Sequence, residues 1–180
     1  ILVSRMDPQK GVDIAVEALK LIKDVPWQAI LLGTGDPGLE SACKDLVELL
    51  PGKVRAVMQF DSKLSRRLYA GADMLMMPSR YEPCGISQMI AMRYGCIPVA
   101  SATGGLVDTI LDDEHDEKAT GFLSPEANPS SFSRTLLRAI NTYQDRDRWQ
   151  QLIISAMTQD FSWDRSAQQY LERYISLAHI

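Results

Sequence analysis

Residues 1–22 read ILVSRMDPQKGVDIAVEALKLI and indicate the kind of fold that the chain adopts. The segment begins with a short apolar run that is typical of a β-strand, and an Asp-Pro loop follows. Apolar residues then recur at helical spacing, at Val12, Ala15, Val16, Leu19 and Ile22. A single apolar stripe of this kind is suited to lie on a sheet, so the segment predicts a strand–loop–helix unit.

The same alternation continues along the chain. We expect strands at residues 1–4, 27–32, 54–60, 74–77 and 97–100, with helical patterns between them. Strands that alternate with helices predict an α/β fold with a parallel sheet flanked by helices. In such a fold the strand ends and the starts of the following helices meet at one edge of the sheet, where ligands normally bind.

The length of 180 residues and the apolar content of 46% predict one domain over residues 1–180. Within it we expect an α/β core at 1–127 and a helical tail at 128–180. The last helix should follow a cap at Ser162, with one apolar face that packs on the body or docks against a missing domain; that face comprises Ala167, Tyr170, Leu171, Tyr174 and Ala178. Because the chain opens without Met, in a strand-like run, we expect a fragment of a longer protein.

The charge and cysteine content narrow the classes of partner. The net charge of −4 comes from 19 basic and 23 acidic side chains without a basic stripe, which disfavours nucleic acid and anionic membranes as partners. Three cysteines without a C-x-x-C pair favour a reducing compartment. We find neither a segment of the roughly 20 apolar residues that a bilayer requires nor a signal or transit peptide. Cytoplasm and plastid stroma both fit this composition.

The loop after the first expected strand carries two cations. Arg5 and Lys10 flank the Asp-Pro turn just before a helix, so both can reach one anion. A guanidinium and an ammonium beside a helix N-terminus are suited to a diphosphate. The alternative is a pair of solvated surface cations without a ligand.

The loop after the fourth expected strand reads PSRYEPCGISQ, residues 78–88. We expect a helix to begin near Gly85, where the backbone lets a ligand approach closely. Glu82 lies just ahead of it, placed to contact a sugar, although it could instead be a first-turn carboxylate of the helix. Cys84 has no His nearby in sequence, so we interpret it as a lining residue rather than a nucleophile. The helix should turn its apolar residues inward, namely Ile86, Met89, Ile90 and Tyr94.

Three further motifs suggest other chemistry. Residues 33–38 spell G-x-G-x-x-G, and Asp61 stands where a ribose-binding acid would lie, so a nicotinamide-dependent oxidoreductase is an alternative. Against it, Pro37 stiffens the loop and no catalytic Tyr-x-x-x-Lys follows. The acidic run at 112–117 resembles a metal cluster but is more typical of a solvated loop. Residues 145–147, Asp-Arg-Asp, are better interpreted as a helix cap than as a metal motif.

Three motifs together carry a resemblance to a known family. These are SRMDPQKG at 4–11, PSRYEPCGISQ at 78–88 and AMRYGCIPVASATGGLVDTI at 91–110, in this order. Together they resemble the glycogen synthase and starch synthase family, and the resemblance extends to DFSW at 160–163. It implies the C-terminal, Rossmann-like half of a retaining two-domain glucosyltransferase of the GT-B type.

The resemblance also implies roles for individual residues. Arg5 and Lys10 would neutralise the departing diphosphate, Glu82 would lie beside the transferred glucose, and Phe60 would stack on the base. The remaining substrate-binding residues that it implies are Cys84, Gly85, Ile86, Ser87, Thr103, Gly104 and Gly105. Two positions depart from related transferases, because Phe60 stands where a Tyr also occurs and Ile90 stands where many have a ribose-binding Glu.

The function implied is glucosyl transfer from ADP-glucose or UDP-glucose to the non-reducing end of an α-1,4-glucan, with retention and without a metal or other cofactor. The partners would be the donor, the glucan and a missing N-terminal domain, without which this domain would be inactive. Two alternatives remain besides the oxidoreductase. A non-catalytic synthase-like module would bind glucan or a partner, and a phosphorylase of the same architecture would need a lysine-bound pyridoxal phosphate.

Overall fold

The computed structural model describes residues 1–113 and 118–178, in which strands and helices alternate. The strands are β1 (Leu2–Val3), β2 (Ala29–Leu32), β3 (Val54–Val57), β4 (Met74–Met77), β5 (Ile97–Ser101) and β6 (Phe122–Ser124). The helices are α1 (Val12–Leu21), α2 (Pro37–Leu49), α3 (Ser62–Gly71), α4 (Ser87–Arg93), α5 (Gly105–Thr109), α6 (Pro129–Gln144), α7 (Arg146–Met157) and α8 (Trp163–Ala178). One turn of 3-10 helix, η1 (Pro8–Lys10), lies between β1 and α1.

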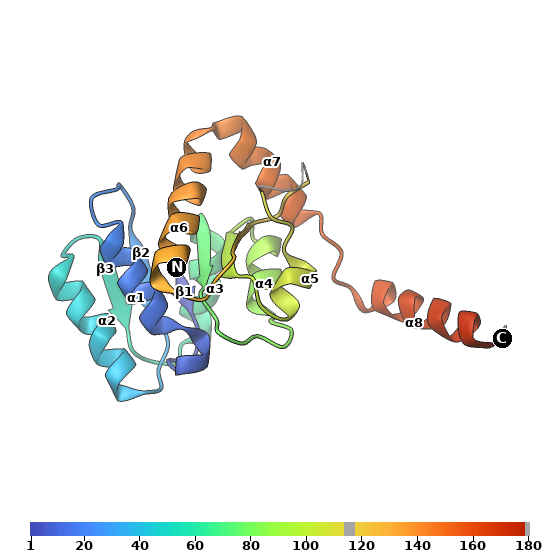
Figure 1. Ribbon diagram of the computed structural model, residues 1–180, viewed down its shortest axis with the longest axis horizontal. Helices are drawn as coiled ribbons and strands as arrows, with labels where there is room; N and C mark the ends of the chain where they lie inside the picture. Colours follow the sequence, from blue (N-terminus) through green and yellow to red (C-terminus); the bar gives the residue numbers. More distant parts are fainter. Residues whose placement is uncertain (114–117, 179–180) are drawn as a thin grey trace.

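The strands form two parallel groups, β1-β2-β3 and β4-β5-β6, that meet at Ile1. The Ile1 amino group donates to the Met74 carbonyl at 2.7 Å, and the Ile1 carbonyl accepts from the Met76 N–H at 2.7 Å. In a parallel pair of strands, one residue bonds through its N–H and C=O to the two residues that flank its partner on the adjacent strand, as Ile1 does here. The strand order is therefore 3-2-1-4-5-6, that of a doubly wound α/β fold, and the predicted parallel sheet is confirmed (Figure 1).

The helices flank these strands in two groups. Helix α1 packs against α2 and α6, while α4 contacts α3, α5 and α7 (Figure 1). Strands with helices on both faces are mainly apolar, because both faces are buried, and β4 and β5 follow this pattern. The largest fully buried side chains include Leu2, Leu31, Leu75, Ile97 and Phe122, each from a strand.

Several strand boundaries differ from the sequence prediction. Strand β2 begins at Ala29, because Trp27 belongs to the preceding turn, where its indole N–H donates to the Ile22 carbonyl at 2.7 Å. Strand β3 ends at Val57, because the Gln59 N–H bonds back to the Val57 carbonyl at 3.0 Å and turns the chain out of the sheet. Strand β6 was not predicted, since three residues are too few to show a pattern.

The predicted inward face of α4 is wrong. Ile86, Ile90 and Tyr94 are exposed, whereas Gln88, Ala91 and Met92 are buried. The prediction followed the apolar stripe, but the amide of Gln88 finds three hydrogen-bond acceptors in the interior. These hydrogen bonds from Nε2 offset part of the cost of burying a polar side chain, and they fix the rotation of the helix.

The helices after residue 128 form the expected tail, and their caps agree with the sequence. Asn128 caps α6, Asp145 caps α7 as predicted, and the Ser162 hydroxyl accepts from the Arg165 N–H at the start of α8. Helices α6 and α7 pack on the strands, but α8 extends away from the body and buries none of its residues (Figure 1). Its apolar side chains are exposed, including Trp163, Tyr170, Leu171 and Tyr174.

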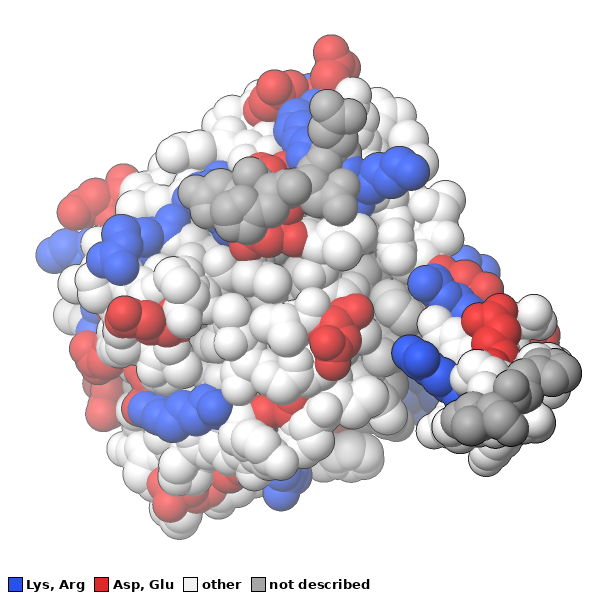
Figure 2. All heavy atoms as spheres, turned by 45° about the vertical axis from the view of Figure 1, so that its right-hand side comes forward, with Lys and Arg blue, Asp and Glu red and all other residues white. Residues whose placement is uncertain are grey.

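Charged side chains are mixed by sign on the face drawn in Figure 2, with a broad area of uncharged atoms among them. Among the described residues, no helix is both long and apolar enough to cross a bilayer.

Gly11 gives a test of how closely the first loop approaches the second half of the sheet. Its φ is +65°, and a Cβ there would lie 2.0 Å from the Pro78 carbonyl oxygen. Gly52 has a similar φ of +83° with nothing within 4 Å, so Gly52→Ala isolates the cost of the left-handed backbone, roughly 1–2 kcal/mol. We predict that Gly11→Ala lowers the free energy of unfolding in urea by at least about 2 kcal/mol more than Gly52→Ala. Equal losses would contradict the close approach.

Candidate functional site

The first loop of the site is shaped by Asp7. Its carboxylate accepts from the Lys10 N–H at 3.0 Å and caps η1, in which Pro8 holds the first position. Proline suits that position because its ring fixes φ and it has no N–H to leave unpaired. The single turn carries Lys10 to the carboxyl end of β1, facing the loop that follows β4.

The second loop is clamped to the first by Arg80. Its guanidinium donates to the Pro8 carbonyl at 2.7 Å and makes two bonds to the Asp13 carboxylate, at 2.8 and 2.6 Å. Backbone atoms add to the contact, because the Arg80 N–H donates to the Gln9 carbonyl at 2.9 Å. The hydrogen bond from Arg80 lowers the pKa of Asp13, so this pair loses its stabilising effect as pH falls through that lowered value.

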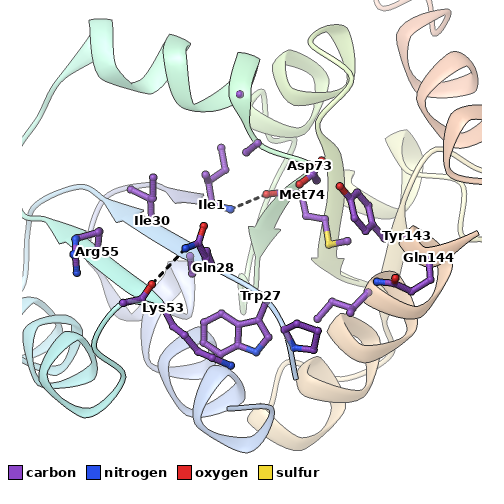
Figure 3. Close-up of a pocket in the computed structure, with 16 residues that line it drawn as sticks. Ile1, Trp27, Gln28, Ile30, Lys53, Arg55, Asp73, Met74, Tyr143 and Gln144 are labelled. Atoms are coloured by element: carbon purple, nitrogen blue, oxygen red, sulfur yellow. Dashed lines mark hydrogen bonds between the residues drawn. The ribbon is translucent and has the colours of Figure 1, made fainter. Parts of the chain in front are cut away.

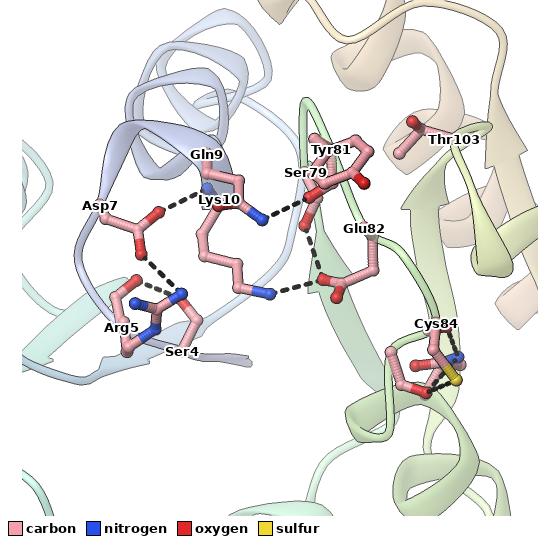
Figure 4. A network of polar contacts seen from close by, with 12 residues as sticks. Ser4, Arg5, Asp7, Gln9, Lys10, Ser79, Tyr81, Glu82, Cys84 and Thr103 are labelled. Atoms are coloured by element: carbon pink, nitrogen blue, oxygen red, sulfur yellow. Dashed lines mark hydrogen bonds and ion pairs between the residues drawn. The ribbon is translucent and has the colours of Figure 1, made fainter.

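Lys10 and Glu82 meet between the two loops. The Lys10 Nζ lies 2.6 Å from Glu82 Oε2, and the Ser79 hydroxyl lies 3.4 Å from the same oxygen (Figure 4). The exposed fraction of the side chain is 21% for Lys10 and 8% for Glu82. Such a partner offsets the cost of taking a carboxylate out of water. The two residues that the sequence placed on separate loops are thus brought together.

Arg5 lies at the rim of the same region. Its side chain is 72% exposed and pairs with Asp7 at 3.2 Å, while Lys10 points inward to Glu82 (Figure 4). Both cations of the first loop are therefore balanced by carboxylates, and the positive charge that the sequence suggested is neutralised within the loops.

Two neighbouring hollows open at this edge. One of about 170 Å³ is lined by residues that include Arg5, Lys10, Glu82 and Ser87. The other, of about 240 Å³, is lined by residues that include Arg5 and Phe60, whose side chain is 86% exposed in the loop after β3. The hollows share Val3, Ser4 and Arg5 and lie side by side at the ends of β1, β2 and β4, and we refer to the two together as the depression.

The loop before α5 presses against the loop that carries Glu82. The Gly105 N–H donates to the Glu82 carbonyl at 3.0 Å, and a Cβ on Gly105 would meet the Cys84 backbone at 2.5 Å. Thr103 lies on the same loop, and its hydroxyl is 3.5 Å from the Arg80 carbonyl. Cys84 and Ile86 are exposed and line neither hollow. Thr103, Gly104 and Gly105 thus support the Glu82 loop from behind and do not line the hollows either.

The G-x-G-x-x-G segment at 33–38 has its own carboxylates. Glu40 accepts from the Gly35 N–H at 2.9 Å, and Asp36 caps α2 by accepting from Leu39 at 3.0 Å. The segment also follows β2 rather than β1. A dinucleotide phosphate would need these backbone amides, but two carboxylates already occupy them. This arrangement disfavours the oxidoreductase alternative.

The acidic run at 112–117 lies partly outside the described residues, as do both histidines. Asp112 pairs with Arg138 at 2.8 Å, and Asp113 pairs with Arg148 at 2.5 Å. The expectation of a solvated loop is wrong for these two side chains, because they tie the loop to α6 and α7. No cluster of three possible metal ligands occurs among the described residues.

A larger hollow of about 670 Å³ lies at the opposite edge of the sheet, lined by Trp27, Lys53, Arg55 and Tyr143 among others (Figure 3). Its polar groups already serve the fold. The Lys53 ammonium donates to the Lys23 and Val25 carbonyls and lies over the Trp27 ring. None of the residues that the sequence singled out lines it.

The fold and this edge define a class of protein, a doubly wound α/β domain with a charged depression at the carboxyl ends of its strands. The sequence profile of the family Glycosyl transferases group 1 matches residues 1–153, and the chain belongs to that family.

Curated relatives and a solved structure narrow this class. The chain is 45% identical over 174 residues to a glycogen synthase of Elusimicrobium minutum, covering 96% of this chain and 36% of the relative. It is 42% identical over 175 residues to that of Thermotoga maritima, with the same coverage. The catalytic domain of starch synthase IV from Arabidopsis thaliana, bound to ADP and acarbose, superposes with a TM-score of 0.85 at 37% identity, covering 97% of this chain and 37% of that one. The chain is a glycosyltransferase domain similar to those of glycogen and starch synthases, with the Rossmann-like fold of a GT-B half.

Sequence reasoning missed three residues of the site. Ser79, Arg80 and Gln88 all stand in the motif PSRYEPCGISQ, in which roles were predicted only for Glu82 and for residues 84–87. Because they stand inside a motif that is specific to the resemblance, all three could have been selected as candidate site residues from the sequence. The partner of Arg80, however, lies 67 positions away at Asp13, and no local pattern connects them.

Cys84 gives a test of the site's exposure. Cys43 and Cys96 are buried, and burial raises the pKa of their thiols to about 11 and about 12. Since the thiolate is the reactive form, neither should react at pH 8. We predict that a thiol reagent modifies Cys84 alone in the native protein and all three cysteines in urea, as counted by mass spectrometry. Labelling of a native Cys84→Ser variant would refute the described burial.

Proposed function

We propose that this domain binds ADP-glucose or UDP-glucose at the ends of β1 and β4 and supplies the donor half of a retaining glucosyltransferase that extends the non-reducing end of an α-1,4-glucan. The observation that carries the proposal is the Lys10–Glu82 pair, which places a cation and a nearly buried carboxylate in one hollow beside a second hollow with an aromatic ring. The chain spans about 36% of its curated relatives, so the activity of the whole protein belongs to the proposal.

The two hollows suggest how the base, the diphosphate and the glucose of the donor would be arranged along the depression. Phe60 would stack on the base in the larger hollow, since its ring is exposed and stacking would remove its apolar face from water. Arg5 lines both hollows and would meet the diphosphate at their junction. Glu82 would then hold glucose in the smaller hollow. The ADP in the related starch synthase IV structure is consistent with a nucleoside diphosphate as the ligand.

The chemistry needs positive charge where the leaving diphosphate becomes more negative. Arg5 and Lys10 would supply it, so no metal is required. Glu82 would orient and polarise the sugar through hydrogen bonds rather than form a covalent intermediate. Attack would take place on the face that the diphosphate leaves, which retains the anomeric configuration, and the departing phosphate would help to take the proton of the acceptor.

Charge balance adds a requirement to this scheme. In the structure Asp7 holds Arg5 and Glu82 holds Lys10. A diphosphate must therefore compete with Asp7 for the exposed guanidinium of Arg5. For Lys10 the competition is smaller, because an ammonium has three donors and can bond to Glu82 and a phosphate at once.

Other parts of the site and the protein complete the proposal. The turn of Cys84, Gly85, Ile86 and Ser87 would approach the sugar and phosphates, and the loop of Thr103, Gly104 and Gly105 would support it. An N-terminal half of the protein would carry much of the site for the acceptor glucan and would close over this domain for catalysis. We propose that the same half packs against the exposed face of α8. A non-catalytic module, by contrast, would fold in the same way without affinity for nucleotide.

Calorimetric titration of ADP, UDP and NAD into the 180-residue chain tests the proposal. We predict that ADP or UDP binds, that Lys10→Ala weakens binding about tenfold or more, and that Arg5→Ala weakens it less because Arg5 is exposed. Asp7→Asn keeps the cap, since Asn caps as well as Asp, and frees Arg5, so it should tighten binding about twofold to fivefold.

Lys44→Ala is the matched control, because it removes an exposed cation on α2 without touching the depression. If Lys44→Ala weakened nucleotide binding as much as Lys10→Ala does, the loss of affinity would reflect the more negative net charge of the variant and not a contact in the depression. Binding of NAD alone would move the site to residues 33–38, and no binding of ADP or UDP would contradict the proposal in favour of the non-catalytic module.

A further inference from the structure

Gln88 is a buried polar residue with no part in the proposed chemistry. Its exposed fraction is 0%, and its Nε2 lies 3.1 Å from the Cys84 carbonyl, 3.1 Å from the Gly85 carbonyl and 3.0 Å from the Thr109 hydroxyl. The Thr109 hydroxyl itself donates to the Gly105 carbonyl at 2.8 Å, so towards Gln88 it accepts. Three acceptors around one atom require the NH₂ group there, which fixes the orientation of the amide.

The hydrogen bonds of Gln88 also decide where the backbone N–H groups of the turn point. In a trans peptide the carbonyl and the following N–H point in opposite directions, and the described chain contains no cis peptide. Because the carbonyls of Cys84 and Gly85 point inward to Gln88, the N–H groups of Gly85 and Ile86 point outward. Neither N–H bonds to an acceptor among the described residues. Two successive free donors in a turn form a concavity suited to an anion.

The other end of the amide indicates that Gln88 is more than a space filler. Its Oε1 is buried without a donor among the described residues. An unpaired buried acceptor is unfavourable, and an apolar side chain of similar length would avoid that cost. A Cβ at Gly85 would also lie 2.5 Å from Oε1, so the amide fills the space directly beneath the turn. What glutamine provides here, and an apolar side chain cannot, is the hydrogen bonding of its Nε2 to the Cys84 and Gly85 carbonyls.

We propose that Gln88 is a positioning residue that aims the N–H groups of Gly85 and Ile86 at the diphosphate of the donor. This inference rests on the proposed function. Ser87, the next residue in the turn, lines the smaller hollow together with Arg5 and Lys10, the two cations proposed for the diphosphate, so the turn that carries the two donors borders that hollow. Gln88 touches no ligand itself and acts through the backbone.

The Gly85 amide can be observed alone by NMR. The sequence contains one Cys-Gly pair, at residues 84–85, so labelling cysteine with ¹³C at the carbonyl and glycine with ¹⁵N gives a single correlated signal from that peptide. We predict that this signal shifts when ADP saturates the wild-type chain. In Gln88→Met, which removes the donor at similar length, the signal should start at a different position, its shift with ADP should largely disappear, and ADP should bind about tenfold more weakly.

Gln150→Met makes the same chemical change on the exposed surface of α7 and should leave both readouts as in the wild type. A Gly85 signal that responds to ADP equally in Gln88→Met would overturn the positioning role while leaving the proposed function intact. ADP binding that weakens with Lys10→Ala but never moves the wild-type Gly85 signal would do the same. Absence of binding of both ADP and UDP to the wild-type chain would overturn both proposals, and if UDP alone binds, the same measurements are made with UDP.

A measurement on the wild-type chain applies even if Gln88→Met does not fold. An outward N–H without an acceptor should exchange with solvent rapidly and shift strongly with temperature, and saturating ADP should slow that exchange. Slow exchange of the Gly85 amide before ADP is added would show that it is already bonded, which would overturn the inference.

Discussion

The ion pair of Lys10 and Glu82 connects the two halves of the parallel sheet at the edge where the site forms. Lys10 follows β1, which belongs to the first group of strands, and Glu82 follows β4, which begins the second. Glu82 is nearly buried, and the ammonium of Lys10 offsets the cost of taking its carboxylate out of water. The clamp of Arg80 on Asp13 and the approach of Gly11 to Pro78 hold the two loops at the distance that this pair requires.

The same constraint explains how a region of nearly balanced charge can be a binding site for an anion. Two cations face two carboxylates, so the loops are stable without a ligand. One pair is largely buried, while the other, between Arg5 and Asp7, is exposed and weak, so the proposed diphosphate would have to displace only the weak pair. Backbone donors held by Gln88 would add attraction without adding charge. The fold thus supplies a rigid inner part and an adaptable rim.

The fold was largely predictable from the sequence, and the site only in part. Buried parallel strands are continuous apolar runs, so β1, β4 and β5 were visible, whereas β6 was too short to detect. Arg5, Lys10 and Glu82 were selected because each follows a strand, and the structure brings all three to the lining of one hollow, while their roles stay predictions. The rotation of α4 was predicted wrongly, because three hydrogen bonds to Gln88 outweigh the apolar stripe of Ile86 and Ile90. Contacts such as Arg80 with Asp13 join distant segments and require the folded chain.

A double-mutant cycle on Lys10→Met and Glu82→Gln measures the central interaction directly. Each single variant leaves a charge without its partner in a poorly hydrated place, so each should lower the free energy of unfolding in urea. The double variant should lose less than the sum of the two, with a coupling of about 1 kcal/mol or more. Losses that add to within about 0.5 kcal/mol would show that the two residues do not interact, and the ion pair could then not be what holds the two halves of the site together.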